Sequence, residues 1–355
     1  MSKLKSKLLL VLVVIFALVG SLLSGCGGEK QKQAVAPAEQ KGKTQEKVVI
    51  KFASSFPMES NVTESMKLFK EKAEKNSNGR LEVQLYPGSQ LYADKEMWQV
   101  LGKGGIEMAW LNPDIGTGIV PSLGLTYFFC YFDDRDHYYR MLNGEPGQII
   151  GKDIEELAKV KVLSWGEFGS VGAISRKPIK TLEDWKGLRI RSPGQYTAIF
   201  LKEIGSAPTP ISSAELYQAM QRGIVEGALT AVPGFYSRKL FEVAKYVPDT
   251  YVSTVGIILG ASVEFWNKLP ADLQKIVLEA AQEAGKYAQD TSLRDDAAAI
   301  EKVKAAGVQF IPISPEEKTR WRKATLPKMS EELKKQIGEE KAQKLLDAVE
   351  ALRKK

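Results

Sequence analysis

Apolar and polar residues alternate from residue 48 onward in short segments that predict β-strands. Three such segments are 48–53 (VVIKFA), 81–86 (LEVQLY) and 106–110 (IEMAW). A period of two is typical of a strand with one buried face. The segments between them have helical spacing, with one helix expected over 90–101. This β-α-β-α-β order favours a parallel sheet covered by helices, so we expect an α/β fold whose ligand lies beyond the carboxyl ends of the strands.

A second α/β unit is expected from residue 162 onward. It begins with VLSWGEFGSVGAIS, a long strand pattern that contains three glycines. Glycines inside a strand indicate bends, which a strand that crosses between two lobes would need. A helix is expected over 196–204 and a strand over 225–232. Between these, Ser212 and Glu215 form an S-x-x-E capping box that predicts the start of another helix.

The strand pattern of residues 186–194 (KGLRIRSPG) places Arg189 and Arg191 on one face and Leu188 and Ile190 on the other. Two guanidinium groups on one face repel each other, and a buried arginine without a partner is costly. Either this face is exposed and both charges are solvated, or one arginine holds an anion.

Residues 270–306 contain no internal proline and a single glycine, Gly285. This pattern predicts a helix roughly 50 Å long at 1.5 Å per residue, which is too long for one small domain. We therefore expect a helix that spans two lobes. The Lys/Glu-rich tail after Ser314 predicts further amphipathic helix.

The N-terminus has the pattern of a signal peptide. Three lysines precede an apolar run over 8–19, which is followed by LSGC ending at Cys26. The run is short for a membrane span, which needs roughly 20 residues, although an uncleaved anchor is the alternative. LSGC resembles the lipobox of bacterial lipoproteins, so Cys26 is expected to be lipidated after removal of residues 1–25. Residues 26–47 predict a flexible tether.

Charge and composition exclude several classes of function. The net charge is +7 and falls to +4 without the three signal-peptide lysines, and the basic residues are spread along the chain. This distribution does not favour nucleic-acid binding. The only histidine, His137, excludes a multi-histidine metal site and is expected on a helix surface. Cys130, in the apolar string TYFFCYF, is expected to be a buried structural thiol.

Several longer strings resemble one family. The string KGLRIRSPG, followed by GSAPTPISSAELYQAMQRGIVEGALT and LFEVAKY, is similar to the solute-binding proteins of tripartite ATP-independent periplasmic (TRAP) transporters, of the dicarboxylate-binding (DctP-like) type. GSQLYADKEMWQVLGKGGIEMAW and WNKLPADLQKIVLEAA resemble the same family. The likeness runs in order from about residue 48 to the end.

The resemblance implies a two-lobed periplasmic-binding-protein-like fold with a long helix that spans both lobes. It implies lobe 1 over 48–168 with 257–296, and lobe 2 over 169–256 with 297–355. The cleft between the lobes would close on a small carboxylate. We expect no cofactor, and the sequence names no residue as a metal ligand. A lipid-anchored protein outside the cytoplasm, in the periplasm or on the cell surface, would then deliver this ligand to the TRAP membrane subunits.

By position in the family motif, Arg191 would hold the ligand carboxylate with a two-pronged salt bridge, and Arg189 would be peripheral. Thr230 stands where many relatives have asparagine. Some relatives have a second arginine on the crossover strand, but this chain has no basic residue between Lys161 and Arg176. A second carboxylate would then find no obvious partner, which favours a monocarboxylate such as a 2-oxo or hydroxy acid.

Further cleft candidates each have an alternative role. Glu167 could bind a ligand hydroxyl or amine, or a neighbouring lysine, and Ser213 could bind an anion at a helix start already capped by Ser212. Trp110 could wall the cleft, and Phe235 and Tyr236 could stack on an apolar part of the ligand, although all three could instead pack in the core. Trp165 is a further candidate on the crossover strand, near the hinge. Ser55 and Phe56 follow the first strand and could offer donors to the ligand.

Two other functions are alternatives to a TRAP binding protein. The first is a binding protein with the same fold that serves an ATP-driven importer or a sensor kinase. A neighbouring gene for an ATPase would favour this alternative. The second alternative is a lipid-anchored hydrolase. The sequence has no G-x-S-x-G elbow, P-loop or Ser/His pairing, so we expect no catalytic residues and no enzyme.

Overall fold

The computed structural model describes residues 47–249 and 252–353. The predicted signal peptide, the lipidation site Cys26 and nearly all of the predicted tether lie outside the described residues. None of the described helices is both long and apolar enough to cross a membrane.

The described part of the chain has ten strands in one connected system, in the order β2-β1-β3-β9-β4-β7-β5-β6, with β8 paired to β4 and β10 paired to β8. Their bounds are β1 Val48–Ser54, β2 Leu81–Tyr86, β3 Met108–Leu111, β4 Val160–Ser175, β5 Arg189–Ser192, β6 Ala207–Pro210, β7 Gly227–Ala231, β8 Tyr246–Asp249, β9 Thr254–Ser262 and β10 Gln309–Pro312.

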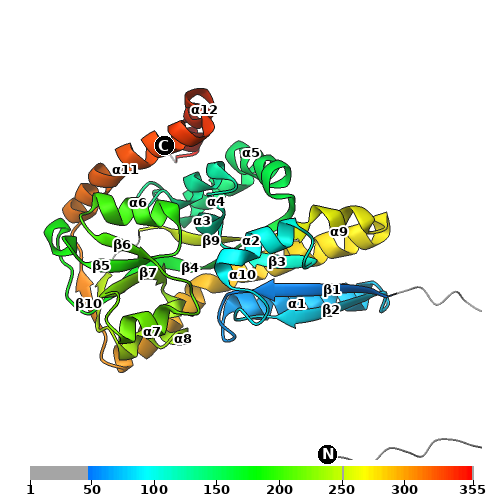
Figure 1. Cartoon of the computed structure of the whole chain (residues 1–355), viewed down its shortest axis with the longest axis horizontal. Coiled ribbons are helices and arrows are strands. Elements are labelled where there is room, and N and C mark those ends of the chain that lie inside the picture. Colours follow the sequence, from blue (N-terminus) through cyan, green and yellow to red (C-terminus); the bar gives the residue numbers. More distant parts are fainter. Residues whose placement is uncertain (1–46, 250–251, 354–355) are drawn as a thin grey trace, which may run out of the picture. The chain divides into compact units, whose positions relative to one another are not determined.

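The strands divide into two parallel groups. β1 pairs in parallel with β2 and β3, as the sequence predicts, and β5 pairs in parallel with β6 and β7. We call the part built on β1–β3 the first lobe and the part built on β5–β7 the second lobe (Figure 1). The antiparallel pair β4 and β9 joins them, because β9 pairs with β3 while β4 pairs with β7.

β4 bends where it passes between the lobes. Its register on β9 shifts between Glu167 and Gly169, and Gly169 has a φ of +150°. Glycine adopts this backbone conformation without the clash that a Cβ would cause. The glycines in the predicted crossover strand therefore mark a real bend.

Twelve α-helices cover the strands of the described chain. Their bounds are α1 Asn61–Asn76, α2 Asp94–Gly102, α3 Pro113–Gly116, α4 Arg135–Asn143, α5 Glu145–Asp153, α6 Gln195–Glu203, α7 Leu216–Gln221, α8 Pro233–Ser237, α9 Val263–Lys268, α10 Ala271–Ala305, α11 Pro315–Ile337 and α12 Glu339–Ala351. The short helices η1 Pro121–Tyr127, η2 Ile154–Ala158, η3 Leu182–Trp185 and η4 Leu240–Glu242 lie in the connections.

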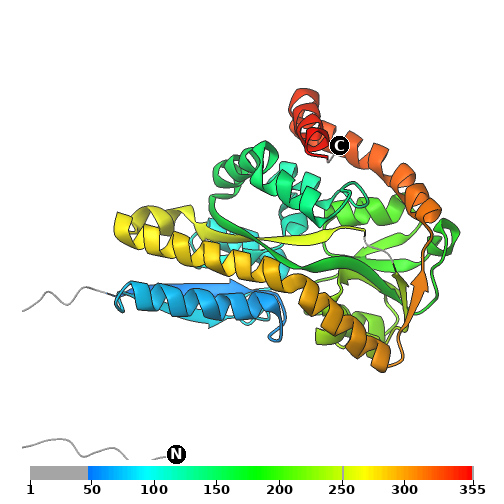
Figure 2. The ribbon, with the colours of Figure 1, turned by 180° about the vertical axis from the view of Figure 1, so that it is seen from behind.

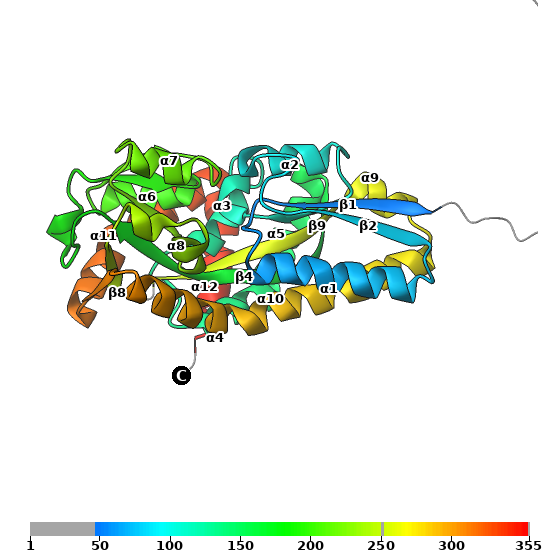
Figure 3. The ribbon, with the colours of Figure 1, turned by 90° about the horizontal axis from the view of Figure 1, so that it is seen from below.

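The long helix α10 runs along both lobes, as expected (Figure 2). It has 35 residues and packs against α1 of the first lobe, β4 and α8 of the second lobe. Figure 3 shows it beside α1 and β4 from below. At 1.5 Å per residue it extends about 52 Å.

Two sequence predictions about helices are wrong. His137 is not on a helix surface but fully buried, because α12 covers α4 and the His137 Nε2 lies 3.0 Å from the Val349 carbonyl oxygen. Ser212 does not cap α7, which begins at Leu216 without a side-chain cap. The Ser212 hydroxyl instead donates to the Glu215 carboxylate at 2.5 Å. Cys130 is buried, as predicted.

Candidate functional site

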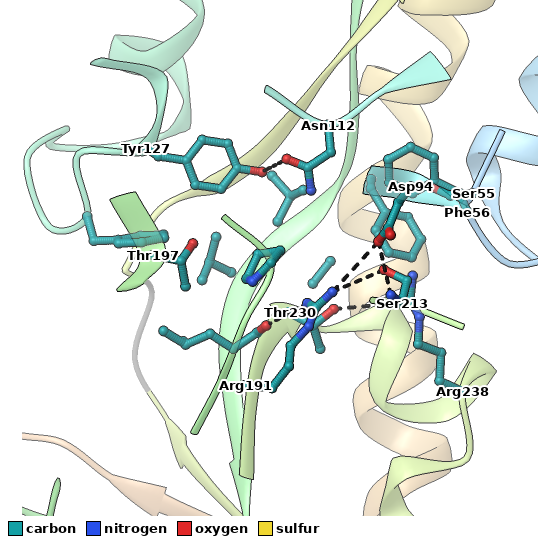
Figure 4. Close-up of a pocket in the computed structure, with 17 residues that line it drawn as sticks. Ser55, Phe56, Asp94, Asn112, Tyr127, Arg191, Thr197, Ser213, Thr230 and Arg238 are labelled. Atoms are coloured by element: carbon teal, nitrogen blue, oxygen red, sulfur yellow. Dashed lines mark hydrogen bonds and ion pairs between the residues drawn. The ribbon is translucent and has the colours of Figure 1, made fainter. Parts of the chain in front are cut away.

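A cavity lies where the carboxyl ends of the two parallel strand groups face each other (Figure 4). Ser55 and Phe56 follow β1 and Asn112 follows β3, on the first-lobe side. Arg191 lies near the end of β5 and Thr230 near the end of β7, on the second-lobe side. Ligands of open α/β sheets bind at such strand ends, so both lobes direct their strand ends to one site.

The cavity continues into a larger outer pocket. The inner cavity has a volume of about 30 Å³, and the outer pocket has a volume of about 570 Å³. Ser55, Ser213 and Arg238 line both. These three residues therefore lie at the boundary between the small inner cavity and the larger outer pocket.

Arg191 is held rigidly at the centre of the site. Its side chain is 3% exposed, and its Nε donates to the Ile211 carbonyl at 2.9 Å. Nη1 donates to the Leu229 carbonyl at 3.2 Å, and Nη2 donates to the Ser213 hydroxyl at 3.2 Å. These bonds use three of the five guanidinium donors and leave one on each terminal nitrogen. Donors on both terminal nitrogens suit the two oxygens of a carboxylate.

Asp94 reaches the same place from the first lobe. It is the first residue of α2 and is 5% exposed. Its Oδ2 accepts a hydrogen bond from the Ser213 backbone N–H at 3.0 Å and lies 3.9 Å from Arg191 Nη2. The carboxylate of Asp94 thus lies within ion-pair distance of Arg191, the guanidinium group that is suited to a carboxylate ligand.

A second buried aspartate connects the lobes behind the cavity. Asp114 of α3 accepts hydrogen bonds at the start of α6 from the Tyr196 N–H at 2.9 Å and from the Thr197 hydroxyl at 2.5 Å. Burial raises the pKa of Asp114 to about 6, although these hydrogen bonds oppose the shift. Gly194 permits the approach, because a Cβ there would lie 2.4 Å from the Asp114 carbonyl oxygen.

The remaining wall is mainly aromatic and aliphatic, with one neutral polar pair. The Tyr127 hydroxyl donates to Asn112 Oδ1 at 2.9 Å. Burial holds the pKa of Tyr127 well above its usual range, so the hydroxyl is neutral at ordinary pH. Phe129, Phe168 and Val255 supply apolar surface. The site therefore combines a few fixed polar groups with an apolar enclosure, as small-molecule sites commonly do.

Arg238, at the C-terminal end of α8, is the second arginine that lines the cavity. The expectation that a second carboxylate would find no basic partner is therefore wrong. The crossover strand indeed has no arginine at the site, but Arg238 reaches the cavity from another element. The argument for a monocarboxylate loses its basis with this finding.

Half of the candidate ligand-binding residues meet at the cavity. Those that line it are Ser55, Phe56, Arg191, Ser213 and Thr230. Tyr236 lines the outer pocket and stacks on Phe241, with ring centroids 5.5 Å apart. Trp110 and Phe235 are buried in two separate hydrophobic clusters, so the core-packing alternative describes both. Trp165 is partly buried and packs against the cluster that contains Trp110.

Glu167 is fully buried but does not line the cavity. Its Oε2 accepts hydrogen bonds from Arg135 Nε at 2.6 Å and from the Tyr139 hydroxyl at 2.7 Å. Burial raises the pKa of Glu167, and the charge of Arg135 opposes this shift. Its partner is an arginine of α4 rather than a ligand or the expected lysine.

Sequence reasoning named none of five further polar residues of the cavity as candidates: Asp94, Asn112, Tyr127, Thr197 and Arg238. Asn112 lies two residues after the predicted strand over 106–110, so its position alone was a usable signal. Asp94 falls inside a segment expected to be helical from residue 90, whereas α2 begins at Asp94 itself. Arg238 had no local signal, because it follows a five-residue helix whose direction depends on tertiary packing.

Within the described residues, no three histidine, cysteine, aspartate or glutamate side chains gather in a way that could hold a metal ion. Two guanidinium groups and one carboxylate from the described residues line the cavity, and this excess of positive groups suits an anionic ligand.

Comparison with known proteins agrees with this geometry. The family model described as bacterial extracellular solute-binding protein, family 7, matches residues 52–336. The C4-dicarboxylate-binding periplasmic protein DctP of Rhodobacter capsulatus is 26% identical, over 83% of this chain and 89% of its own length.

Solved structures of TRAP periplasmic solute-binding proteins have the same fold. One from Sulfurospirillum deleyianum, with bound succinate, is 28% identical with a TM-score of 0.78, covering 85% of this chain and 99% of its own. One from Citrobacter koseri, with bound D-glucuronate, is 28% identical with a TM-score of 0.79, covering 86% and 100%. Such proteins bind substrates for transporters and are not enzymes. The family match over most of the chain, together with this shared two-lobed fold, shows that the protein belongs to the DctP-like solute-binding proteins of TRAP transporters, bacterial extracellular solute-binding protein family 7.

Proposed function

We propose that this protein captures a small organic acid between its two lobes, with Arg191 as the anchor of the ligand carboxylate. The observation that carries the proposal is the state of the Arg191 guanidinium, which is buried, fixed by three hydrogen bonds, and left with one donor on each terminal nitrogen. The ligands named for the related proteins, which are a C4-dicarboxylate, succinate and D-glucuronate, each carry a carboxylate.

The proposal extends to delivery and location. The acid is handed to a TRAP-type membrane permease, and the protein is held outside the cytoplasm by a lipid on Cys26. The LSGC motif supports the anchor. Cys26→Ser should release the protein from the membrane fraction of the cells that express it, and continued association of this variant with membranes would refute the anchor.

A thermal-shift screen against small organic acids identifies the ligand, because binding to the folded state adds about 2.7 kcal/mol of stability at a hundredfold excess over Kd. Calorimetric titration of variants with that acid then tests the anchor. Arg191→Ala should weaken binding roughly 30- to 3,000-fold, the effect of about 2–5 kcal/mol for removing one partner of a buried charge pair.

Arg189→Ala is the matched control from the same strand. Arg189 is exposed, and its Nη2 donates to the Gly223 carbonyl at 3.1 Å. Its removal should change Kd by less than about threefold, since a solvated charge contributes at most about 1 kcal/mol. Loss of binding in Arg189→Ala but not in Arg191→Ala would overturn the assignment of the anchor.

A further inference from the structure

The cavity contains a guanidinium that the anchoring of one carboxylate does not use. Arg238 is partly buried at the boundary between the inner cavity and the outer pocket. It lies on the second lobe, as Arg191 does, but it comes from the end of α8 rather than from β5. Figure 4 shows both arginines at the same cavity.

The contacts of Arg238 within the described chain are weak. Its Nη1 donates to the Thr230 hydroxyl at 3.5 Å, and its guanidinium carbon lies 5.5 Å from the centre of the Phe168 ring. No carboxylate among the described residues lies within ion-pair distance of it. Gly234 leaves room for it, since a Cβ there would lie 2.5 Å from Arg238 Nη1.

The electrostatic surroundings compensate the charge of Arg238 only in part. Burial and the nearby charge of Arg191 lower the pKa of Arg238 to about 10, and the carboxylate of Asp94 only partly offsets them. Arg238 therefore remains charged at neutral pH, next to another cation. Asp94 lies within 3.9 Å of Arg191 and is hydrogen-bonded to Ser213, so its strongest contacts are with the anchor and not with Arg238.

We propose that Arg238 forms a second anion-binding subsite, and that the ligand is an acid with two anionic groups, one held by Arg191 and the other by Arg238. This inference rests on the proposed function. A charge-assisted hydrogen bond from Arg238 to the second anionic group would replace water around this partly desolvated cation. The negative charge of that group would also offset the repulsion between the two arginines. Phe168 and Phe129 would then enclose the carbon chain between the two acidic groups.

The test compares diacids with otherwise matched monoacids. Calorimetry would measure Kd for three pairs: succinate and succinamate, glutarate and glutaramate, and galactarate and galactonate. In each monoacid one carboxylate becomes a neutral group of similar size. The wild-type protein should bind the best diacid about 10- to 100-fold more tightly than its partner, the usual effect of a hydrogen bond to a charged group.

Arg238→Gln should abolish this preference, so that the Kd values of each diacid and its monoacid lie within about threefold of each other. Arg238→Lys should restore part of it, because an ammonium keeps the charge but lacks the planar fork. Arg189→Gln is the control for loss of a positive charge on the same lobe and should keep the full preference. Thermal denaturation of each variant without ligand shows whether it is folded.

Each other outcome overturns the inference. A wild-type protein that binds no diacid more tightly than its monoacid refutes it without any variant. If Arg238→Gln weakens both members of a pair equally, the two arginines grip one carboxylate together and no second subsite exists. Failure of the underlying function looks different, because Arg191→Ala would then leave the binding of monoacids and diacids unchanged.

Discussion

Arg189 and Arg191 are two residues apart on one strand, yet they have opposite environments. Arg189 is exposed and bonds to the Gly223 carbonyl, whereas Arg191 is 3% exposed and faces the cavity. The difference arises because Arg191 is one residue from the end of β5, where the opposite lobe covers it. At the scale of the residue, distance from the strand end decides between a solvated charge and a binding group.

Asp94 gives a prediction at this scale. Its carboxylate places a negative charge beside Arg191, which opposes an incoming carboxylate. Asp94→Asn keeps an acceptor for the Ser213 N–H but removes the charge. For an acid without hydroxyl groups, calorimetry should show binding tightened by about 3- to 30-fold, the order expected for removing a like charge several ångströms away at an intermediate dielectric. Weaker binding would show that Asp94 itself serves the ligand.

At the scale of the element, the packing of α10 depends on Gly285, although glycine is unfavourable inside a helix. Gly285 lies in the middle of the helix, where glycine costs about 1 kcal/mol relative to alanine. A Cβ at this position would lie 1.9 Å from the Ser164 hydroxyl oxygen and 2.6 Å from the Trp165 carbonyl oxygen of β4. The glycine is thus required for the close packing of the long helix on the crossover strand.

Gly285→Ala should therefore destabilise the protein by about 1–3 kcal/mol, the usual cost of overpacking, despite the gain in helix propensity. Gly151→Ala in α5 is the matched control, since nothing lies within 4 Å of a Cβ there. That variant should be stabilised by about 0.5–1 kcal/mol. Chemical denaturation measures both, and a stabilised Gly285→Ala variant would contradict the packing argument.

At the scale of the whole molecule, buried charges lie beside the bend of β4. Asp296 of α10 accepts a hydrogen bond from the Ser170 N–H at 2.9 Å, and its Oδ1 has no hydrogen-bond partner in the described chain. Burial raises the pKa of Asp296 to about 6, to which the charge of Glu167 also contributes. The proposed lobe boundaries, at 168/169 and 296/297, fall at this same place.

This raised pKa makes stability depend on pH. The folded state retains the Asp296 proton up to about pH 6, whereas an unfolded aspartate loses it near its ordinary pKa of 3.8. The stabilising effect of the proton is therefore present below about pH 4 and is lost as the pH rises to about 6. An asparagine at this position cannot lose such a proton, so the Asp296→Asn variant should not undergo this decrease in the free energy of unfolding. Above pH 6 the decrease in the wild type is about 1–3 kcal/mol. Denaturation between pH 4.5 and 7.5 should show the difference from wild type growing with pH, and a constant difference would refute the assignment.

Closure of the lobes is the prediction for the molecule as a whole. The cavity takes residues from both lobes, and β4, β9 and α10 connect them. We expect an open form without ligand and a closed form with ligand. Small-angle scattering should give a smaller radius of gyration when the acid identified by the screen is saturating. An unchanged profile would mean that binding needs no hinge motion.

Much of this protein could be predicted from its sequence. The parallel strands of the first lobe, the crossover strand, the long helix, the family and the location of Arg191 near a strand end follow from periodicity and motif, because these depend on neighbours along the chain. Alternation decides which face of a strand an arginine occupies, and the turn that follows decides where the strand ends.

Only the tertiary structure decided what covers each face. His137 is buried because α12, more than 200 residues later, packs over its helix, and Glu167 pairs with Arg135 across the bend of β4. Arg238 enters the cavity because a five-residue helix turns it toward β5 and β7. Sequence periodicity carries no information about such contacts, since burial and charge pairing depend on distances between elements that are far apart along the chain.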